Sequence, residues 1–205
     1  MKKLGMIICL IGLCYTSWNG WLYWKQLSAV TPIRTELSAE VERVAASKKK
    51  TSVSSIPAST YVQYEEGQEI GQLIIPALDR EHILYWGTTD TTLDQGLGVY
   101  DTPFTSVPSV SEHTAIAGHR DTSFRRLGEL ENNDLLYLVI EDIMYEYQIR
   151  DSWVTDAEDR TVLVQKKEPT LTLTTCYPFQ YIGAAPDRYI VQATLTNIQR
   201  MQEKQ

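Results

Sequence analysis

Three side chains in the C-terminal two-thirds of the chain have the chemistry for acyl transfer, and each lies at the end of a strand-like run. Cys176 ends the β-branched run 172–175, His119 follows the apolar run 115–118, and Arg188 opens a further run. A thiolate attacks a carbonyl carbon, an imidazole moves protons, and a guanidinium stabilises an oxyanion. We therefore interpret Cys176 as the nucleophile, His119 as the proton donor and acceptor, and Arg188 as the stabiliser of the oxyanion or substrate.

Each of these residues, taken alone, also has an ordinary structural explanation. A buried cysteine usually packs as a small hydrophobe, a histidine beside a glycine is often a turn residue, and an arginine at a strand start is usually solvated. The conjunction favours chemistry, because Cys176 is the only cysteine outside the N-terminal apolar segment that holds Cys9 and Cys14. No disulfide framework can therefore form in the rest of the chain.

Other polar residues near these three have weaker claims to the chemistry. His113 precedes the apolar run rather than following it, and His82 begins another run beside Glu81, where a surface pair is the simplest interpretation. Asp121 comes just after His119 and could orient the imidazole, although the N-cap of a short helix is its better supported role. Thr175 could contact substrate through its backbone or hydroxyl, and packing within the strand is an equal alternative.

The order His, Cys, Arg, with GHRDT around the histidine and TLTTC ending at the cysteine, resembles the sortases, cysteine transpeptidases of the Gram-positive cell surface. The resemblance covers roughly Ile70 to Thr196. The segments CYPF at 176–179 and APDRY at 185–189 look most like the class D sortases of bacilli and clostridia. On this resemblance, Tyr177 and Pro178, together with Thr175, are the candidates for substrate contact.

The resemblance implies a reaction and its partners. A sorting signal like Leu-Pro-x-Thr-Gly is cleaved after Thr, a thioacyl intermediate forms on Cys176, and an amine of the peptidoglycan precursor resolves it. For class D relatives from bacilli it points to Leu-Pro-x-Thr-Ala and to the diaminopimelate side chain as acceptor. The substrates would be surface proteins that bear this signal at their C-terminus.

No cofactor is expected. Some sortases bind calcium through a comparable acidic loop, but the spacing of Asp151, Asp156, Glu158 and Asp159 matches no calcium loop, and stimulation by calcium is a minor alternative. The net charge is −7, and no basic face alternates with aromatic residues. Nucleic acid is therefore not an expected partner.

Two other functions use the same residues. A cysteine peptidase would hydrolyse its thioacyl intermediate, and only the acceptor distinguishes it from a transpeptidase. A catalytically silent surface module would hold peptide in a groove of the domain. The presence of Cys176, His119 and Arg188 together argues against the module, which has no need of all three.

The N-terminus predicts a membrane anchor. The segment from Leu4 to Trp24 is long enough to span a bilayer as a helix, and its C-terminal end is rich in tryptophan and tyrosine, as at a membrane interface. Lys2 and Lys3 precede the segment and Lys25 follows it, which favours a cytoplasmic N-terminus and an extracellular domain, single-pass in the cell membrane. A cleaved signal peptide is the alternative, although no small-x-small site closes the apolar stretch.

The domain organisation follows from these patterns. We expect a signal anchor over 1–25, a spacer helix and linker over 26–65, the catalytic domain over 66–199 and a polar tail over 200–205. Ile33, Leu37, Val41 and Val44 recur at helical spacing, so this helix is either a simple spacer or packs over the domain. The stretch 48–59 is a Ser/Thr/Lys/Pro-rich linker.

The domain itself predicts an all-β fold. Short apolar runs separated by turn residues favour an antiparallel sandwich or a closed barrel with little helix. One helical piece is expected over 123–130, and Glu141-Asp142 has the length of a two-residue hairpin turn. The resemblance implies the eight-stranded sortase β-barrel with short helices, preceded by the transmembrane anchor. The expected strands are 70–75, 82–86, 114–117, 135–140, 143–149, 171–175 and 189–195.

Overall fold

The computed structural model describes residues 2–28, 30–34, 38–39, 41, 43, 63–108, 113–180, 183 and 185–201. The expected linker over 48–59 and most of the expected polar tail lie outside the described residues.

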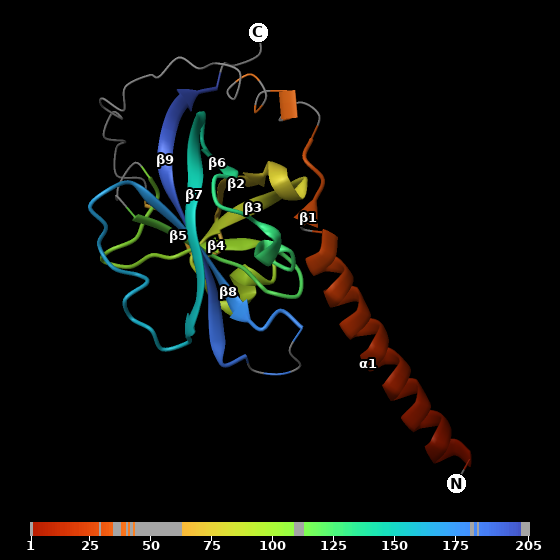
Figure 1. The fold of residues 1–205 in the computed structure, drawn as a ribbon. Helices are drawn as coiled ribbons and strands as arrows, with labels where there is room; N and C mark the ends of the chain where they lie inside the picture. The colour runs from red at the N-terminus through yellow and green to blue at the C-terminus, as the bar shows by residue number, and fades with distance from the viewer. Residues whose placement is uncertain are drawn as a thin grey trace.

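A closed β-barrel forms the body of the molecule (Figure 1). Neighbouring strands follow the order β3-β2-β6-β7-β9-β8-β5-β4, and the barrel closes where β4 pairs with β3. The β3–β4 and β5–β8 pairings are parallel, and the remaining pairings are antiparallel. The eight-stranded barrel is thus confirmed, but as a mixed sheet rather than an antiparallel one. Its strands are β2 (Glu69–Ile75), β3 (Arg80–Trp86), β4 (Leu97–Val99), β5 (His113–Ala117), β6 (Leu135–Ile140), β7 (Ile143–Asp156), β8 (Thr170–Tyr177) and β9 (Asp187–Arg200).

The barrel interior is filled by alternate side chains of its strands. Successive strand residues point to opposite faces. Leu136 and Leu138 of β6 accordingly belong to the inner core, whereas Tyr137 and Val139 belong to a second cluster on the outer face. Burying each large apolar side chain contributes about 1.5–3 kcal/mol. The continuous apolar run of β6 is explained because both of its faces are covered.

Residues that follow the N-terminal helix cover this outer face. The two-residue strand β1 (Val30–Thr31) pairs with β3 beside the segment that pairs with β4. Val41 is buried in the second cluster, and Ile33 packs against it. Of the two arrangements considered for this segment, the described residues adopt the packed one. We call residues 30–43, as far as they are described, the N-terminal strap.

A buried ion pair fixes the strap to the barrel. The Glu81 carboxylate accepts hydrogen bonds from Nη2, Nε and the backbone N–H of Arg34, at 2.6, 3.0 and 3.2 Å. The Glu81 side chain is 2% exposed, against 64% for that of Arg34. The expectation that Glu81 and His82 form a surface pair is therefore wrong. Both are buried, because the strap covers this edge of β3.

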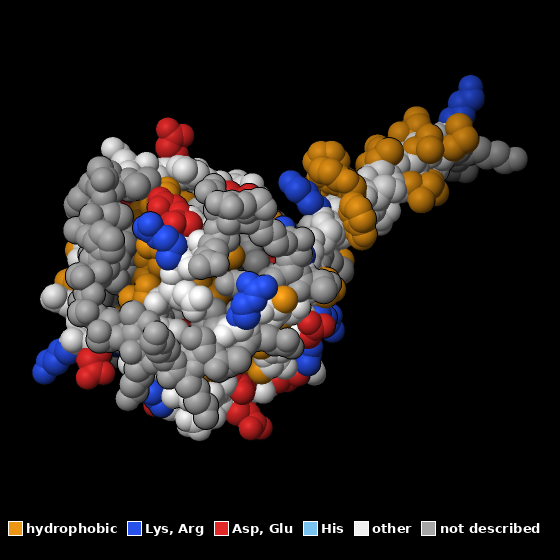
Figure 2. Space-filling model, turned by 90° about the horizontal axis from the view of Figure 1, so that it is seen from above, with side chains coloured by type: hydrophobic (Ala, Val, Ile, Leu, Met, Phe, Trp, Pro, Cys, Tyr) orange, Lys and Arg blue, Asp and Glu red, His pale blue; other side chains and the backbone are white. Residues whose placement is uncertain are grey.

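The helix α1 (Lys2–Ser28) projects from the barrel beside β1 (Figure 1). Its segment Lys3–Lys25 is long and apolar enough to cross a membrane, with a mean hydropathy of 1.2 and no part buried. Figure 2 shows hydrophobic side chains along the projecting helix. These properties suit a membrane anchor or a signal sequence.

The other helices are short. The structure describes α3 (Asp90–Leu93) and the 3₁₀ turns η1 (Pro76–Leu78) and η2 (Leu127–Glu129). The helix expected over 123–130 is wrong, because successive turns lead into η2 there. In this segment the backbone N–H groups of Leu127 and Leu130 donate to the carbonyls three residues earlier, those of Phe124 and Leu127.

Candidate active site

The pairing of β5 with β8 brings His119 level with Cys176. The two strands run parallel, and their register ends with Ala117 opposite Thr174. Beyond it, the N–H of Gly118 donates to the carbonyl of Thr174 at 3.2 Å, and the Thr175 hydroxyl donates to the carbonyl of Gly118 at 2.7 Å. The register therefore continues past the end of β5.

The pairing of β8 with β9 adds Arg188 to the same place. Cys176 and Arg188 are direct partners in this antiparallel ladder. Such partners point to the same face of a sheet, with Cβ atoms about 4.5–5.5 Å apart. Cys176 and Arg188 therefore lie side by side on β8 and β9, and His119 follows the end of β5, the neighbour of β8 on its other side. Contrary to expectation, β8 does not end at Thr175 but continues through the cysteine to Tyr177.

Burial changes sharply along β8 at the candidate nucleophile. Thr174 and Thr175 are buried, at 6% and 3% exposed, whereas Cys176 is partly exposed. The side chain of His119 is 32% exposed. A rigid, buried strand thus presents the thiol at the surface, where a peptide can reach both it and the imidazole.

The Arg188 side chain is held by its own loop. Its Nη1 donates to the carbonyl of Asp187 at 3.0 Å and to that of Ala185 at 3.4 Å. Within the described part of the chain, neither Nε nor Nη2 is engaged in a hydrogen bond. Two donors of the planar guanidinium are therefore available for a substrate carbonyl or an oxyanion.

Asp94 is a site residue that the sequence did not reveal. Its Oδ1 lies 3.5 Å from Nε2 of His119. Asp94 follows α3, and the pairing of Gly98 with Ala117 carries the end of α3 to the histidine. Asp121, the carboxylate considered from the sequence, is exposed in the turn after His119. The short strand β4 was not predicted, so nothing in the sequence linked Asp94 to this place.

Tyr100 is a second residue that the sequence did not reveal. The pKa of its hydroxyl is raised, mainly by burial. The nearby Arg188 opposes this rise, and Cys176 adds to it. The phenol is therefore within electrostatic range of both the thiol and the guanidinium. Tyr100 follows β4, and its N–H donates to the carbonyl of Ala115 at 2.9 Å.

Three aromatic rings gather where β8 ends and β9 begins. Tyr177 stacks on Tyr189 with ring centroids 6.1 Å apart, and Phe179 lies 5.6 and 5.2 Å from these two rings. Phe179 also rests on Gly128, where an added Cβ would approach its ring to 2.7 Å. Two of the three candidates for substrate contact, Tyr177 and Pro178, therefore belong to or adjoin this aromatic wall, and Tyr177 points to the opposite face of β8 from Cys176. The third, Thr175, is buried with its hydroxyl on Gly118.

The other histidines are buried in structural roles. The ring of His113 lies 2.8 Å from the Val164 carbonyl and 2.8 Å from the Thr172 hydroxyl. The ring of His82 meets the edge of Phe124. Burial lowers the pKa of each to about 4, although the hydrogen bond to Val164 opposes this at His113 and Glu81 opposes it at His82. Both rings are therefore neutral at neutral pH.

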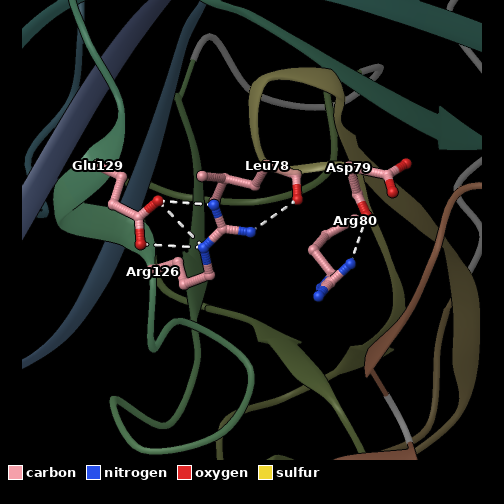
Figure 3. Close-up of polar contacts among 5 residues, drawn as sticks. All are labelled: Leu78, Asp79, Arg80, Arg126 and Glu129. Carbon is pink, nitrogen blue, oxygen red and sulfur yellow. Dashed lines mark hydrogen bonds and ion pairs between the residues drawn. The ribbon is translucent and has the colours of Figure 1, made fainter.

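The turn that follows His119 is braced from outside the site. The guanidinium of Arg126 binds the Glu129 carboxylate at 2.7 to 3.0 Å and donates to the carbonyl of Leu78 at 3.2 Å (Figure 3). This links η2 to η1 across the barrel end. The Leu127 N–H of η2 donates to the Phe124 carbonyl at 3.0 Å, and the Phe124 N–H donates to the His119 carbonyl at 2.8 Å. These two bonds connect η2 to the backbone of the histidine.

The acidic side chains of the loop before β8 accept hydrogen bonds from neighbouring residues of the same segment. Asp159 accepts hydrogen bonds from the Thr155 hydroxyl at 2.5 Å and from the N–H and hydroxyl of Thr161 at 2.8 and 2.7 Å. These bonds lower the pKa of Asp159. Asp156 caps the Glu158 N–H at 2.7 Å. The described part of the loop is thus ordered by its own side chains.

Comparisons with known proteins agree with this geometry. A model of the sortase domain matches residues 73–196. Sortase D of Bacillus subtilis (strain 168) is 33% identical over 199 residues, which are 93% of this chain and 97% of that protein.

Solved structures of sortases share the fold. The catalytic domain of B. anthracis SrtD matches at 46% identity and a TM-score of 0.60, over 70% of this chain and 97% of that one. The Clostridium perfringens sortase D5 transpeptidase matches at 27% identity and a TM-score of 0.59, over 66% and 83%. The chain therefore belongs to the sortase family of cysteine transpeptidases, in its class D branch.

Proposed function

We propose that this sortase cleaves a Leu-Pro-x-Thr-Ala or Leu-Pro-x-Thr-Gly sorting signal after Thr and transfers the protein to an amine of the peptidoglycan precursor. The observation that carries the proposal is the pairing of Cys176 with Arg188 across β8 and β9, with His119 two residues beyond the end of β5, the parallel neighbour of β8. The partly exposed thiol supports it, because a peptide carbonyl can approach from solvent.

The first half-reaction forms the acyl-enzyme. The Cys176 thiolate attacks the threonine carbonyl carbon, and a C–S bond forms. Arg188 donates hydrogen bonds to the oxyanion of the tetrahedral intermediate. The His119 imidazolium then gives its proton to the leaving amine as the C–N bond breaks. A thioester on Cys176 and a free C-terminal fragment remain.

The second half-reaction releases the enzyme. The acceptor amine attacks the thioester carbonyl, and a new amide C–N bond forms as the C–S bond breaks. His119 takes the proton that the attacking nitrogen must lose, which restores the imidazolium and thiolate. Water in place of the amine would give hydrolysis, so the acceptor decides between transpeptidase and peptidase.

The aromatic wall of Tyr177, Phe179 and Tyr189 suits the apolar part of a Leu-Pro signal. Aromatic rings offer large apolar contact area at low entropic cost. Tyr177, Pro178 and Phe179 follow Cys176 in the chain and Tyr189 joins them from β9, so we place the side chains N-terminal to the scissile bond at this wall. Thr175 would act through the position of the Gly118 carbonyl rather than by touching substrate.

The membrane topology is also part of the proposal. α1 would anchor the enzyme with its N-terminus in the cytoplasm and the barrel outside, where sorting signals and wall precursors meet. Lys3 before the apolar stretch and its unburied surface support this. The anchor over 1–25 and the catalytic domain over 66–199 are the proposed functional units, joined by the spacer and linker over 26–65 that includes the N-terminal strap.

Mass spectrometry of the purified full chain with a Leu-Pro-x-Thr-Ala peptide tests the function. We expect an adduct of the Leu-Pro-x-Thr acyl group on Cys176, and its conversion to an amide when diaminopimelate is added. The Cys176→Ala variant should form neither product, whereas Cys9→Ala should form both. Release of free acid at the same rate with and without diaminopimelate would favour the peptidase, and absence of any adduct would reject the proposal.

A further inference from the structure

We infer that Asp94 is a positioning residue that holds Nε2 of His119 and thereby assigns Nδ1 to proton transfer. This inference rests on the proposed function of His119. Its starting point is the 3.5 Å separation between Asp94 Oδ1 and His119 Nε2. A carboxylate accepts hydrogen bonds and does not donate them, so Asp94 favours the forms of the ring that carry a proton on Nε2, the nitrogen nearest to it. The other nitrogen is then the one that can exchange a proton with substrate.

Asp94 is held by backbone bonds at the end of α3. Its N–H donates to the carbonyls of Asp90 and Thr92. The next residue is tied in the same way, since the Gln95 N–H donates to the carbonyl of Thr92 at 3.0 Å. The Asp94 backbone is therefore fixed, and only its short side chain can move.

The beginning of α3 is held by a carboxylate from a distant part of the chain. Glu66 Oε1 accepts hydrogen bonds from the hydroxyls of Thr89 and Thr92, at 2.9 and 2.7 Å, and from the Thr89 N–H at 3.4 Å. These bonds lower the pKa of Glu66, which keeps its carboxylate charged. A charged acceptor at a helix start stabilises the exposed N–H groups there.

Both flanks of α3 are bonded to the barrel. The Gly87 N–H donates to the carbonyl of Val99 at 3.0 Å, and the Gly67 N–H donates to that of Trp86 at 2.8 Å. Gly87 has a φ of 86°, and an added Cβ would meet the Glu66 carboxylate. The pairing of Gly98 with Ala117 then places the end of α3 beside His119. Asp94 is thus carried by a rigid element, as a positioning group requires.

The pair supports both proton-transfer steps. With the Nε2 proton held toward Asp94, the neutral ring offers its Nδ1 lone pair to an attacking amine. After protonation, the carboxylate stabilises the imidazolium until Nδ1 gives its proton to a leaving amine. Asp94 is 54% exposed, so the attraction is modest and screened by salt.

Kinetics of Asp94→Asn and Asp94→Glu in the full chain test this assignment. We expect Asp94→Asn to lower kcat about five-fold with KM unchanged, the upper range for an exposed ion pair, and Asp94→Glu to recover part of the rate. The difference between wild type and Asp94→Asn should shrink as salt rises. Asp90→Asn on the same helix and Asp121→Asn in the turn are the matched controls, which should keep wild-type rates.

A spectroscopic readout separates this inference from the function itself. In the full chain with ¹⁵N-labelled histidine, the neutral His119 ring should carry its proton on Nε2, and Asp94→Ala should shift it toward a mixture of tautomers. This measurement needs no turnover, so it stands even if the enzyme has another substrate. A wild-type ring protonated on Nδ1, or equal kcat in Asp94→Asn and Asp90→Asn, would overturn the inference.

Discussion

The hydroxyl of Thr175 donates a 2.7 Å hydrogen bond to the carbonyl of Gly118. This bond joins the residue before the nucleophile to the residue before the histidine. It lies beyond the last parallel pair of β5 and β8, next to the backbone bond from the Gly118 N–H to the carbonyl of Thr174 at 3.2 Å. These two contacts at Gly118 therefore set the separation of the strands next to the thiol and the imidazole.

Replacing that hydroxyl tests its role. Thr175→Val keeps the shape of the side chain but leaves the Gly118 carbonyl without its donor, which costs about 1 kcal/mol of stability. We expect kcat for peptide cleavage to fall more than KM rises, because the two reacting groups lose their fixed separation. Thr174→Val, a neighbouring buried change, should keep kcat, and Thr175→Ser should restore it. Equal effects of the two valine variants would assign Thr175 a packing role only.

His119 is the histidine that we expect to move protons. His119→Ala should lower kcat/KM at least 100-fold, in the range of general acid–base catalysis. His113→Asn should lower the melting temperature, because it disturbs the buried contacts to Val164 and Thr172, but should keep turnover per folded molecule. Rates corrected for the folded fraction check this. An inactive but folded His113→Asn would move the acid–base role to that residue.

The sequence was sufficient for two of the strands next to the site, because β5 and β8 fall within one or two residues of the expected bounds. The third, β9 (Asp187–Arg200), extends beyond the expected 189–195 at both ends, and β7 continues to Asp156 rather than ending at 149. The sequence motifs around His119, Cys176 and Arg188 identified these three residues as the candidates. The structure adds their register, which follows from the parallel pairing of β5 with β8 and the antiparallel pairing of β8 with β9.

What the sequence could not show depends on long-range contacts. The strand β4 has three residues and a central glycine, and only the closure of the barrel gives it partners. Asp94 and Tyr100 flank it and were missed with it. The burial of Glu81 likewise depends on Arg34, from a segment for which the sequence left both a simple spacer and a helix packed over the domain open. Local patterns carry no signal for such contacts.

The pair of Arg34 with Glu81 should contribute to stability. Arg34→Ala removes the guanidinium and leaves the buried carboxylate with the backbone N–H of residue 34, so we expect a loss of about 2 kcal/mol in the free energy of unfolding. Arg200→Ala breaks the exposed pair with Asp142, in which both side chains are more than half exposed, and should cost less than about 0.5 kcal/mol. Urea unfolding of both variants makes the comparison. Equal losses would mean that the strap is not anchored by Glu81.

The buried histidines predict how stability depends on pH. The unfolded chain takes up protons at His82 and His113 below about pH 6.5, whereas the folded protein resists until about pH 4. Between these values the unfolded state binds more protons, so stability falls as pH falls and is fully present above pH 6.5. Each site accounts for at most about 3 kcal/mol. Unfolding of His82→Leu should show a shallower loss between pH 6.5 and 4, and a curve parallel to wild type would contradict the assignment.

The geometry of Arg188 makes the last prediction. As the direct ladder partner of Cys176, it can offer the oxyanion its Nε and Nη2, which bond to none of the residues that the structure describes. Arg188→Lys keeps the charge but loses the planar fork, so we expect kcat to fall about 100-fold, as when one oxyanion donor is removed. Arg120→Lys is the control, and its kcat should stay near that of the wild type. The Nη2 of Arg120 donates to the Gly183 carbonyl at 2.7 Å. The check is single-turnover measurement of acyl-enzyme formation. Near-wild-type acylation by Arg188→Lys would show that the positive charge alone suffices, and that the fork does not hold the oxyanion.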